Sequence, residues 1–474
     1  MLPPLLSNLY HIHDFVHQAL KQQAGTGNFK GPWFTNLNYL ITCDPINIQY
    51  IMTKKFRNYE KGHGFRERFD VFGDGILAAD SETWKYSRTI LHPLFQKKSF
   101  ELFFEKLVHN KMQTCLLPLL DHVQTQGMEV DLQDVFQRFN FDYSCSLIFG
   151  YDPQSLAIHF PKVTCAKAFT EAEEFLLYRH VMPQSLWKLQ RWLQVGAEKK
   201  LTAACKTFDE FVYERITSKR EELSKFNINE TEQDLLATLM KQEEQVDDKF
   251  LRDTAFNLLA AGRETITAAF TWLFWLVATH PSVEAKMLQE IKKQIVEKGL
   301  NASKLGVKEV KNLVYLHAAI CEALRLYPPV PLNWKQAMKC DILPSGHEVK
   351  VNTVILLSFY SVGRLEEIWG EDCSEFKPER WISETGCIVN VASHEFPSFN
   401  TGPRACLGKN LSMAIMKIVT SAIMWNYDIR VVEDHPISPS FSLVLMMKHG
   451  LKRPYSILED KMKASEMLVC SVVP

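Results

Sequence analysis

The residues best suited to chemistry lie in one stretch, FPSFNTGPRACLG, from Phe396 to Gly408. Its prolines and glycines prevent a regular element before Cys406, and the apolar period of the next residues predicts a helix. Cys406 is therefore expected at a helix start, where free N–H groups and the helix dipole favour a thiolate. Gly402 and Gly408 let the backbone pass close to a flat group, and Arg404 adds a positive charge. Such a thiolate suits an axial ligand of haem iron.

The spacing F-x-x-G-x-R-x-C-x-G is met by Phe399, Gly402, Arg404, Cys406 and Gly408. It resembles the haem-binding loop of the cytochrome P-450 family, in which the cysteine is the proximal iron ligand. The resemblance implies haem b as the cofactor, these five residues around it and Cys406 on the metal. The alternative is a buried structural cysteine before an ordinary helix.

A second chemically promising stretch is AGRET, Ala261 to Thr265, within the apolar segment Asp247 to His280. The segment is too long and too apolar for a surface helix, so we expect it to cross the core. Gly262 costs about 1 kcal/mol relative to Ala in a helix interior, which indicates a close approach by another group. Thr265 can return its hydroxyl to the Ala261 carbonyl one turn earlier, and Glu264 adds a carboxylate.

AGRET is similar to the A/G-G-x-D/E-T pattern of the same family, which lies across the distal face of the haem. The resemblance implies that Thr265 and Glu264 are catalytic and direct protons to bound oxygen. It also places Ala261 and Gly262 against the cofactor. The alternative is a packed helix with a tolerated glycine and a surface glutamate.

Trp84 and Arg88 are four residues apart, so a helix presents both on one face. An indole N–H donates, and a guanidinium can meet a carboxylate with two parallel bonds. The pair resembles the W-x-x-x-R helix of the family, in which both residues bind a haem propionate. The alternative is a core Trp beside a surface Arg.

Glu322 and Arg325 precede LYPPVP, and Arg380 lies in FKPERW. Together they resemble a buried network of the same family. Two arginines and one carboxylate are costly to bury unless all are hydrogen-bonded. We therefore assign this trio to folding and not to chemistry.

Composition is that of an ordinary globular protein, with 46% hydrophobic and 23% charged residues and a net charge of −1. Nothing in it points to nucleic acid. The 11 cysteines are scattered without a CxxC pair, which argues for a reducing compartment. No apolar run reaches the roughly 18 residues of a membrane span. The start, MLPPLLSNLYHIHDF, is similar to family sequences just after the anchor and hinge, so we expect the anchor segment to be missing from this chain.

The expected architecture is mainly α with a small β region, a cytochrome P-450-like haem-thiolate fold. We expect one domain over 1–474, with a flexible tail over 459–474. Short strands are predicted at Trp33–Phe34, Tyr39–Thr42, Glu348–Lys350 and Thr353–Ser358. A last hairpin is predicted from 441–447, with its turn at 448–450.

The resemblance implies a haem-thiolate monooxygenase that uses O2 and electrons from an NADPH-cytochrome reductase on a small hydrophobic substrate. It also implies the cytosolic face of the endoplasmic reticulum and peripheral membrane contact. The stretches NYEKG, ILPSGHEVKV and MKHGL resemble the plant fatty-acid and alkane hydroxylases. We therefore expect terminal or in-chain hydroxylation of a long-chain aliphatic substrate.

Three alternatives remain open. The same branch includes oxidases that couple phenols in alkaloid synthesis, although the intact AGRET favours ordinary monooxygenation. A haem-thiolate isomerase or dehydratase acting on hydroperoxides would need neither O2 nor a reductase. A haem binder without catalysis is the third.

Overall fold

The computed structural model describes residues 11–31, 38–225, 234–242, 246–299, 304–428, 430–432 and 434–453. The predicted strand at Trp33–Phe34 and the predicted tail over 459–474 lie outside these residues.

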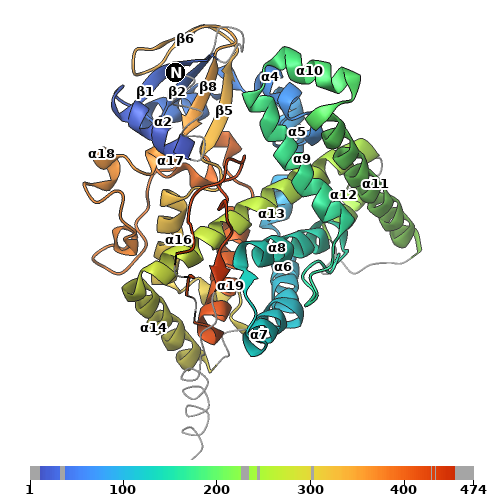
Figure 1. The fold of residues 1–474 in the computed structure, drawn as a ribbon, viewed down its shortest axis with the longest axis vertical. Helices are drawn as coiled ribbons and strands as arrows, with labels where there is room; N and C mark the ends of the chain where they lie inside the picture. Colours follow the sequence, from blue (N-terminus) through green and yellow to red (C-terminus); the bar gives the residue numbers. More distant parts are fainter. Residues whose placement is uncertain are drawn as a thin grey trace, which may run out of the picture.

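Helices form most of the described chain (Figure 1). The prediction of a mainly helical fold with a small β region is confirmed. In chain order the helices are α2 (Ile12–Lys21), α3 (Pro45–Gln49), α4 (Gly62–Arg68), α5 (Ser81–Gln96), α6 (Lys98–Lys111), α7 (Leu117–Thr125), α8 (Leu132–Phe149), α9 (Thr164–Val181), α10 (Gln184–Leu193), α11 (Gly196–Lys225), α12 (Leu235–Gln242), α13 (Asp248–Thr279), α14 (Pro281–Lys298), α15 (Val307–Val310), α16 (Val314–Leu326), α17 (Phe359–Val362), α18 (Glu366–Trp369) and α19 (Lys409–Asn426).

The long helix α13 crosses the middle of the molecule, as predicted (Figure 1). Asp247 caps its start by accepting a hydrogen bond from the Lys249 amide, at 3.3 Å. One hydrophobic cluster packs around its first half, which includes Phe256, and another around its second half, which includes Phe270. Burial on both sides explains why the sequence of α13 is apolar around its whole circumference.

Helix α8 packs along α13 and supports it from one side. Asp131 caps α8 through the Gln133 amide at 2.9 Å, and Gly150 ends it in a left-handed conformation. The ring of Phe136 on α8 lies 5.0 Å from that of Phe270 on α13. A Cβ on Gly262 would lie 3.1 Å from the Ser144 hydroxyl of α8. The predicted close approach at Gly262 is therefore made by a neighbouring helix.

A sheet of order β1-β2-β8-β5-β3 lies at one end of the molecule (Figure 1). Strand β2 runs parallel to β8, and the other neighbours are antiparallel. Strands β2 and β8 confirm two predicted strands, and β7 (Glu348–Val349), which pairs with β6, confirms a third, whereas β1 and β5 were not predicted. The strands are β1 (Thr26–Lys30), β2 (Asn38–Thr42), β3 (Tyr59–Glu60), β4 (Val130–Asp131), β5 (Leu332–Ala337), β6 (Asp341–Ile342), β7 (Glu348–Val349), β8 (Val354–Ser358) and β9 (Lys452–Arg453).

Glu322 and Arg325 of the predicted ionic trio are buried, Arg380 is half-buried, and both arginines are hydrogen-bonded to Glu322. Arg325 donates two hydrogen bonds of 2.7 Å to Glu322, and Arg380 donates a third of 2.7 Å. The indole of Trp381 donates a fourth bond to the same carboxylate, at 2.8 Å. These contacts tie α16 to the segment before the Cys406 loop and confirm a structural role.

The predicted hairpin near the C-terminal end is wrong in register. An antiparallel bridge joins Pro439 to Met447, so residues 441–444 form the bend between them. The chain after the bend then pairs through β9 with β4. Residues 441–444 line the cavity, so this bend carries apolar side chains. The same apolar pattern is typical of a strand, which is why a strand was predicted there.

No single helix among the described residues has the length and apolar composition to cross a membrane. Only the bent pair α13 and α14, which meet at 109°, passes on those two criteria. Most residues of α13 are buried in the core.

Candidate active site

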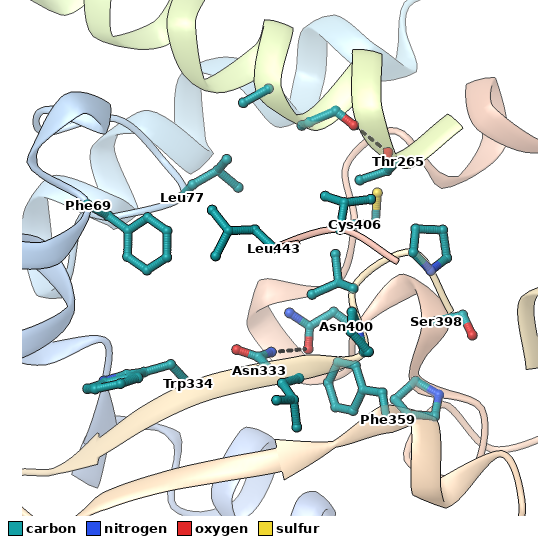
Figure 2. Close-up of a pocket in the computed structure, with 18 of the residues that line it drawn as sticks. Phe69, Leu77, Thr265, Asn333, Trp334, Phe359, Ser398, Asn400, Cys406 and Leu443 are labelled. Atoms are coloured by element: carbon teal, nitrogen blue, oxygen red, sulfur yellow. Dashed lines mark hydrogen bonds between the residues drawn. The ribbon is translucent and has the colours of Figure 1, made fainter. Parts of the chain in front are cut away.

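A cavity of about 1420 Å³ lies between α13 and the Cys406 loop and extends to α2, α9 and the sheet. Most of its walls are apolar. Figure 2 shows Phe69, Leu77 and Leu443 pointing into it, with Cys406 and Thr265 together on one side. The volume exceeds the 300–1,000 Å³ typical of a small-molecule pocket, which leaves room for a large planar group and a substrate beside it.

The Cys406 loop is held in place by its own backbone. The Cys406 amide donates to the Phe399 carbonyl at 2.8 Å, and both side chains line the cavity. Gly402 has φ +68°, and a Cβ there would lie 2.2 Å from the Met52 carbonyl oxygen, so only glycine fits. A Cβ on Gly408 would meet nothing closer than Ser412 Oγ at 3.7 Å and Cys406 Sγ at 3.9 Å. Gly408 therefore leaves open space beside the sulfur.

The exposed surface of Cys406 is the surface of the cavity, because the residue is otherwise enclosed by protein. Burial raises the pKa of the thiol above its usual value. Backbone N–H donors of Gly408 and Lys409 and the charge of Arg88 act in the opposite direction. The predicted effect of the helix start is therefore present, but in the protein alone burial outweighs it. Helix α19 itself begins only at Lys409.

Helix α13 supplies the wall opposite this loop. Ala261, Gly262 and Thr265 line the cavity, as predicted. The Thr265 hydroxyl donates to the Ala261 carbonyl at 2.5 Å, which confirms the predicted bond (Figure 2). Because the Ala261 carbonyl is also the acceptor of a backbone hydrogen bond of the helix, the threonine bond weakens that backbone bond and loosens α13 at the cavity.

Glu264 turns away from the cavity and is not part of its lining. Only 3% of its surface is exposed. It accepts hydrogen bonds from the Gln137 amide at 3.1 and 3.2 Å and lies 2.8 Å from the Arg263 guanidinium. The structure thus brings Thr265 to the cavity and keeps Glu264 behind the helix.

Trp84, Arg88 and Arg404, which are expected to hold propionates, all line the cavity. Each of them also contacts another residue of the protein. Arg88 donates to the Ala405 carbonyl at 2.8 Å. Arg404 donates to Ala79 at 2.6 Å and Asp80 at 2.9 Å, but its Nε is buried without a partner. The Arg404 guanidinium lies 4.9 Å from the Trp84 ring.

Sequence reasoning missed Lys61, which lines the cavity beside Arg404. Its ammonium donates to Asn333 at 3.1 Å, and Asn333 in turn bonds to Asn400 (Figure 2). Burial and the charge of Arg404 lower the pKa of Lys61 to about 7. Burial lowers the pKa of Arg404 to about 10. Lys61 is part of the stretch NYEKG, but a single lysine in a loop gives no sequence signal of a position at the cavity.

These observations fit a haem. Burial disfavours the positive charge of Lys61, and the Nε of Arg404 lacks a hydrogen-bond acceptor. Carboxylates such as propionates would stabilise both groups. The opening beside Gly408 suits a flat ring approaching the Cys406 sulfur. Thiolate donors are known haem ligands.

Comparisons with known proteins agree with this geometry. The cytochrome P-450 family model matches residues 3–453. The chain is 41% identical to alkane hydroxylase MAH1 of Arabidopsis thaliana, over 95% of this chain and 90% of that protein. It is 40% identical to noroxomaritidine synthase of Narcissus aff. pseudonarcissus MK-2014, over 95% and 88%. A crystal structure of a cytochrome P-450 superposes with TM-score 0.79 at 20% identity, covering 94% of this chain and 98% of that one.

The fold and the cysteine-walled cavity define a haem-thiolate protein. The chain belongs to the cytochrome P-450 family. Members of this family bind haem b, and the chain is a monooxygenase that works with O2, a redox partner and a hydrophobic substrate.

Proposed function

We propose that the protein hydroxylates a long-chain aliphatic substrate, a fatty acid or an alkane, at a terminal or in-chain carbon. The observation that carries the proposal is the extended apolar cavity leading away from Cys406 and Thr265 towards α2 and α9. An aliphatic chain gains free energy by leaving water for such walls, at about 0.8 kcal/mol per CH₂ group. The relation to an alkane hydroxylase supports the same substrate class.

In this proposal Cys406 is the axial ligand of the haem iron, and the haem supplies O2 activation and oxygen insertion. Trp84, Arg88, Arg404 and Lys61 hold the propionates. Phe399, Gly402 and Gly408 shape the loop around the ring, and Ala261 and Gly262 form the opposite wall.

Thr265 is proposed to orient protons at the cavity through its hydroxyl, which donates to the Ala261 carbonyl. Glu264 is proposed to hold the protons that are used there. Apolar walls disfavour bulk water at the reaction site, so side chains such as these are proposed to bring protons there.

The electron donor in this proposal is an NADPH-cytochrome reductase. We further propose the cytosolic face of the endoplasmic reticulum and peripheral contact with that membrane. These proposals rest on the relation to plant members of the family.

Phenol coupling is the second candidate. Noroxomaritidine synthase is related to this chain almost as strongly as the alkane hydroxylase. The aromatic rings of Phe69 and Trp334 at the cavity would suit a phenolic substrate as well.

The test is turnover with a reductase and NADPH on three matched substrates: an alkane, a fatty acid and a phenolic amine. Hydroxylated alkane or fatty acid is expected, and coupled phenol as the sole product would contradict the proposal. Turnover without NADPH would favour the isomerase or dehydratase class. The reduced carbon-monoxide spectrum should show a red-shifted thiolate band, and Cys406→Ala should abolish it. Persistence of the band in that variant would remove Cys406 as the ligand.

A further inference from the structure

The part of the cavity wall away from Cys406 carries a group of aromatic side chains. Figure 2 shows Phe69 and Trp334 there, on the side of the cavity opposite Cys406. His180, in the last turn of α9, contacts both rings. The centre of its imidazole lies 5.0 Å from that of Phe69 and 6.4 Å, edge-on, from that of the Trp334 indole. His180 also lines the cavity, so a polar ring stands at an otherwise apolar end.

The imidazole of His180 presents a hydrogen-bond acceptor to the cavity. Its Nδ1 lies 3.2 Å from the carbonyl oxygen of Leu176, one helical turn earlier. A carbonyl oxygen only accepts, so Nδ1 carries the proton of this bond. Burial and the charge of Arg68 lower the pKa of His180 to about 4, so the ring is neutral near pH 7 and Nε2 has a free lone pair.

The orientation of α9 places this lone pair on the cavity side. Glu173, Leu176, Leu177 and His180 are spaced by three, four and seven residues, so they share one face of the helix. All four line the cavity. Because Nδ1 is turned back to the helix backbone, the ring edge that carries Nε2 faces outward. No residue among those that the structure describes donates to Nε2.

The cations near His180 do not face the cavity. The guanidinium of Arg68 lies 5.3 Å from the centre of the Trp334 ring and donates to the Gly64 carbonyl at 3.0 Å. Arg179 donates to Glu198 at 2.7 Å. Neither arginine is part of the cavity lining. A carboxylate at Nε2 would therefore bring two acceptors together without either guanidinium beside them.

We propose that His180 accepts a hydrogen bond from the hydroxyl group of a long-chain alcohol and holds that end of the chain away from Cys406. Oxygen is then added towards the opposite end of the chain. A hydroxyl group can donate to Nε2, whereas a carboxylate only accepts and an alkane leaves the acceptor unpaired. The inference rests on the proposed function, because the chain occupies the same cavity. It extends the substrate class from alkanes and fatty acids to aliphatic alcohols.

The first test compares ligands on the wild-type holoenzyme: a long-chain primary alcohol, its methyl ether, and the fatty acid of equal length. Affinity is measured at about pH 7 by the ligand-induced shift of the haem absorption and by calorimetry. The alcohol should bind roughly fivefold more tightly than its ether, because only the alcohol can donate to Nε2. Equal affinity of alcohol and ether overturns the proposal, and so does tighter binding of the fatty acid.

The second test removes the acceptor. His180→Phe keeps a ring beside Phe69 and Trp334 but lacks Nε2, so it should weaken the alcohol roughly fivefold and leave the matching alkane unchanged. His180→Gln, whose amide oxygen can accept, should restore part of the alcohol affinity. His159→Phe, at an exposed position outside the cavity lining, is the control. Equal weakening of alcohol and alkane in His180→Phe shows a packing role alone and overturns the proposal.

Turnover with a reductase and NADPH separates this inference from the proposed function. The alcohol should yield a diol whose new hydroxyl lies towards the far end of the chain, as located by mass spectrometry. Oxidation at the carbon that already carries the hydroxyl overturns the anchor at His180. Binding of the alcohol that depends on His180, without a hydroxylated product from any substrate, contradicts the proposed function alone. If His180→Phe does not retain haem, the ratio of alcohol to ether affinity in the wild type decides.

Discussion

The guanidinium of Arg88 donates a 2.8 Å hydrogen bond to the carbonyl oxygen of Ala405, the residue immediately before Cys406. One side chain of α5 thereby fixes the loop that carries the sulfur and also faces the cavity. Partners that orient a metal ligand commonly contribute about 10–100-fold to metal affinity. The loop position and the haem site are therefore coupled through Arg88.

Arg88→Ala should weaken haem retention by about tenfold or more, since both the loop contact and the proposed propionate partner are lost. The ratio of haem to protein after gel filtration, and transfer of haem to apomyoglobin, measure the change. Lys85→Ala, an exposed position on the same helix, is the control and should retain haem normally. Equal retention in both variants would show that the Ala405 contact is dispensable.

Thr265→Val should keep haem and fold but divert electrons to peroxide, with roughly tenfold less product per NADPH. Thr271→Val is the matched control, because Thr271 makes the same hydroxyl-to-carbonyl bond one turn back without lining the cavity. Product and peroxide per NADPH are the measurements. Equal yields in both variants would exclude a role for the Thr265 hydroxyl.

Glu322→Gln should destabilise the protein by about 3–5 kcal/mol, because the buried Arg325 loses its counter-charge and Arg380 keeps only Asp372. The unfolding midpoint in urea, or the thermal inactivation half-life, reports the loss. Glu366→Gln removes a pair with Lys21 of the same 2.7 Å length at the surface, and little change is expected there. A similar small effect at Glu322 would contradict the buried-network account.

Lys61→Met should stabilise the haem-free protein more at low pH than at high pH. The pKa of Lys61 is about 7 in the fold against 10.5 in the unfolded chain, so the folded state binds fewer protons between those values. The free energy of unfolding therefore rises with pH across that window, and the variant loses this dependence. Melting of the haem-free protein at about pH 6 and about pH 10 tests the sign. The same variant should bind haem more weakly, since the proposed propionate partner is removed.

Short sequence motifs were sufficient to indicate the family of the protein. The order F-x-x-G-x-R-x-C-x-G predicted a loop that presents a cysteine, because loop geometry depends on neighbouring residues. That the AGRET helix forms the wall opposite this loop was implied by the resemblance to the family. The Thr265 bond to Ala261 is a contact within one helical turn, so spacing alone predicted it. Glu322 and Arg325 likewise share one helix face.

Tertiary packing decided what spacing could not. Glu264 turns from the cavity because Gln137 of α8 and Arg263 hold it, and Glu173 arrives there from α9. The Lys61 pKa and the raised pKa of the Cys406 thiol both follow from burial by distant segments. Long-range burial and cross-helix hydrogen bonds have no period in the sequence, so only the folded chain determines which acid faces the cavity.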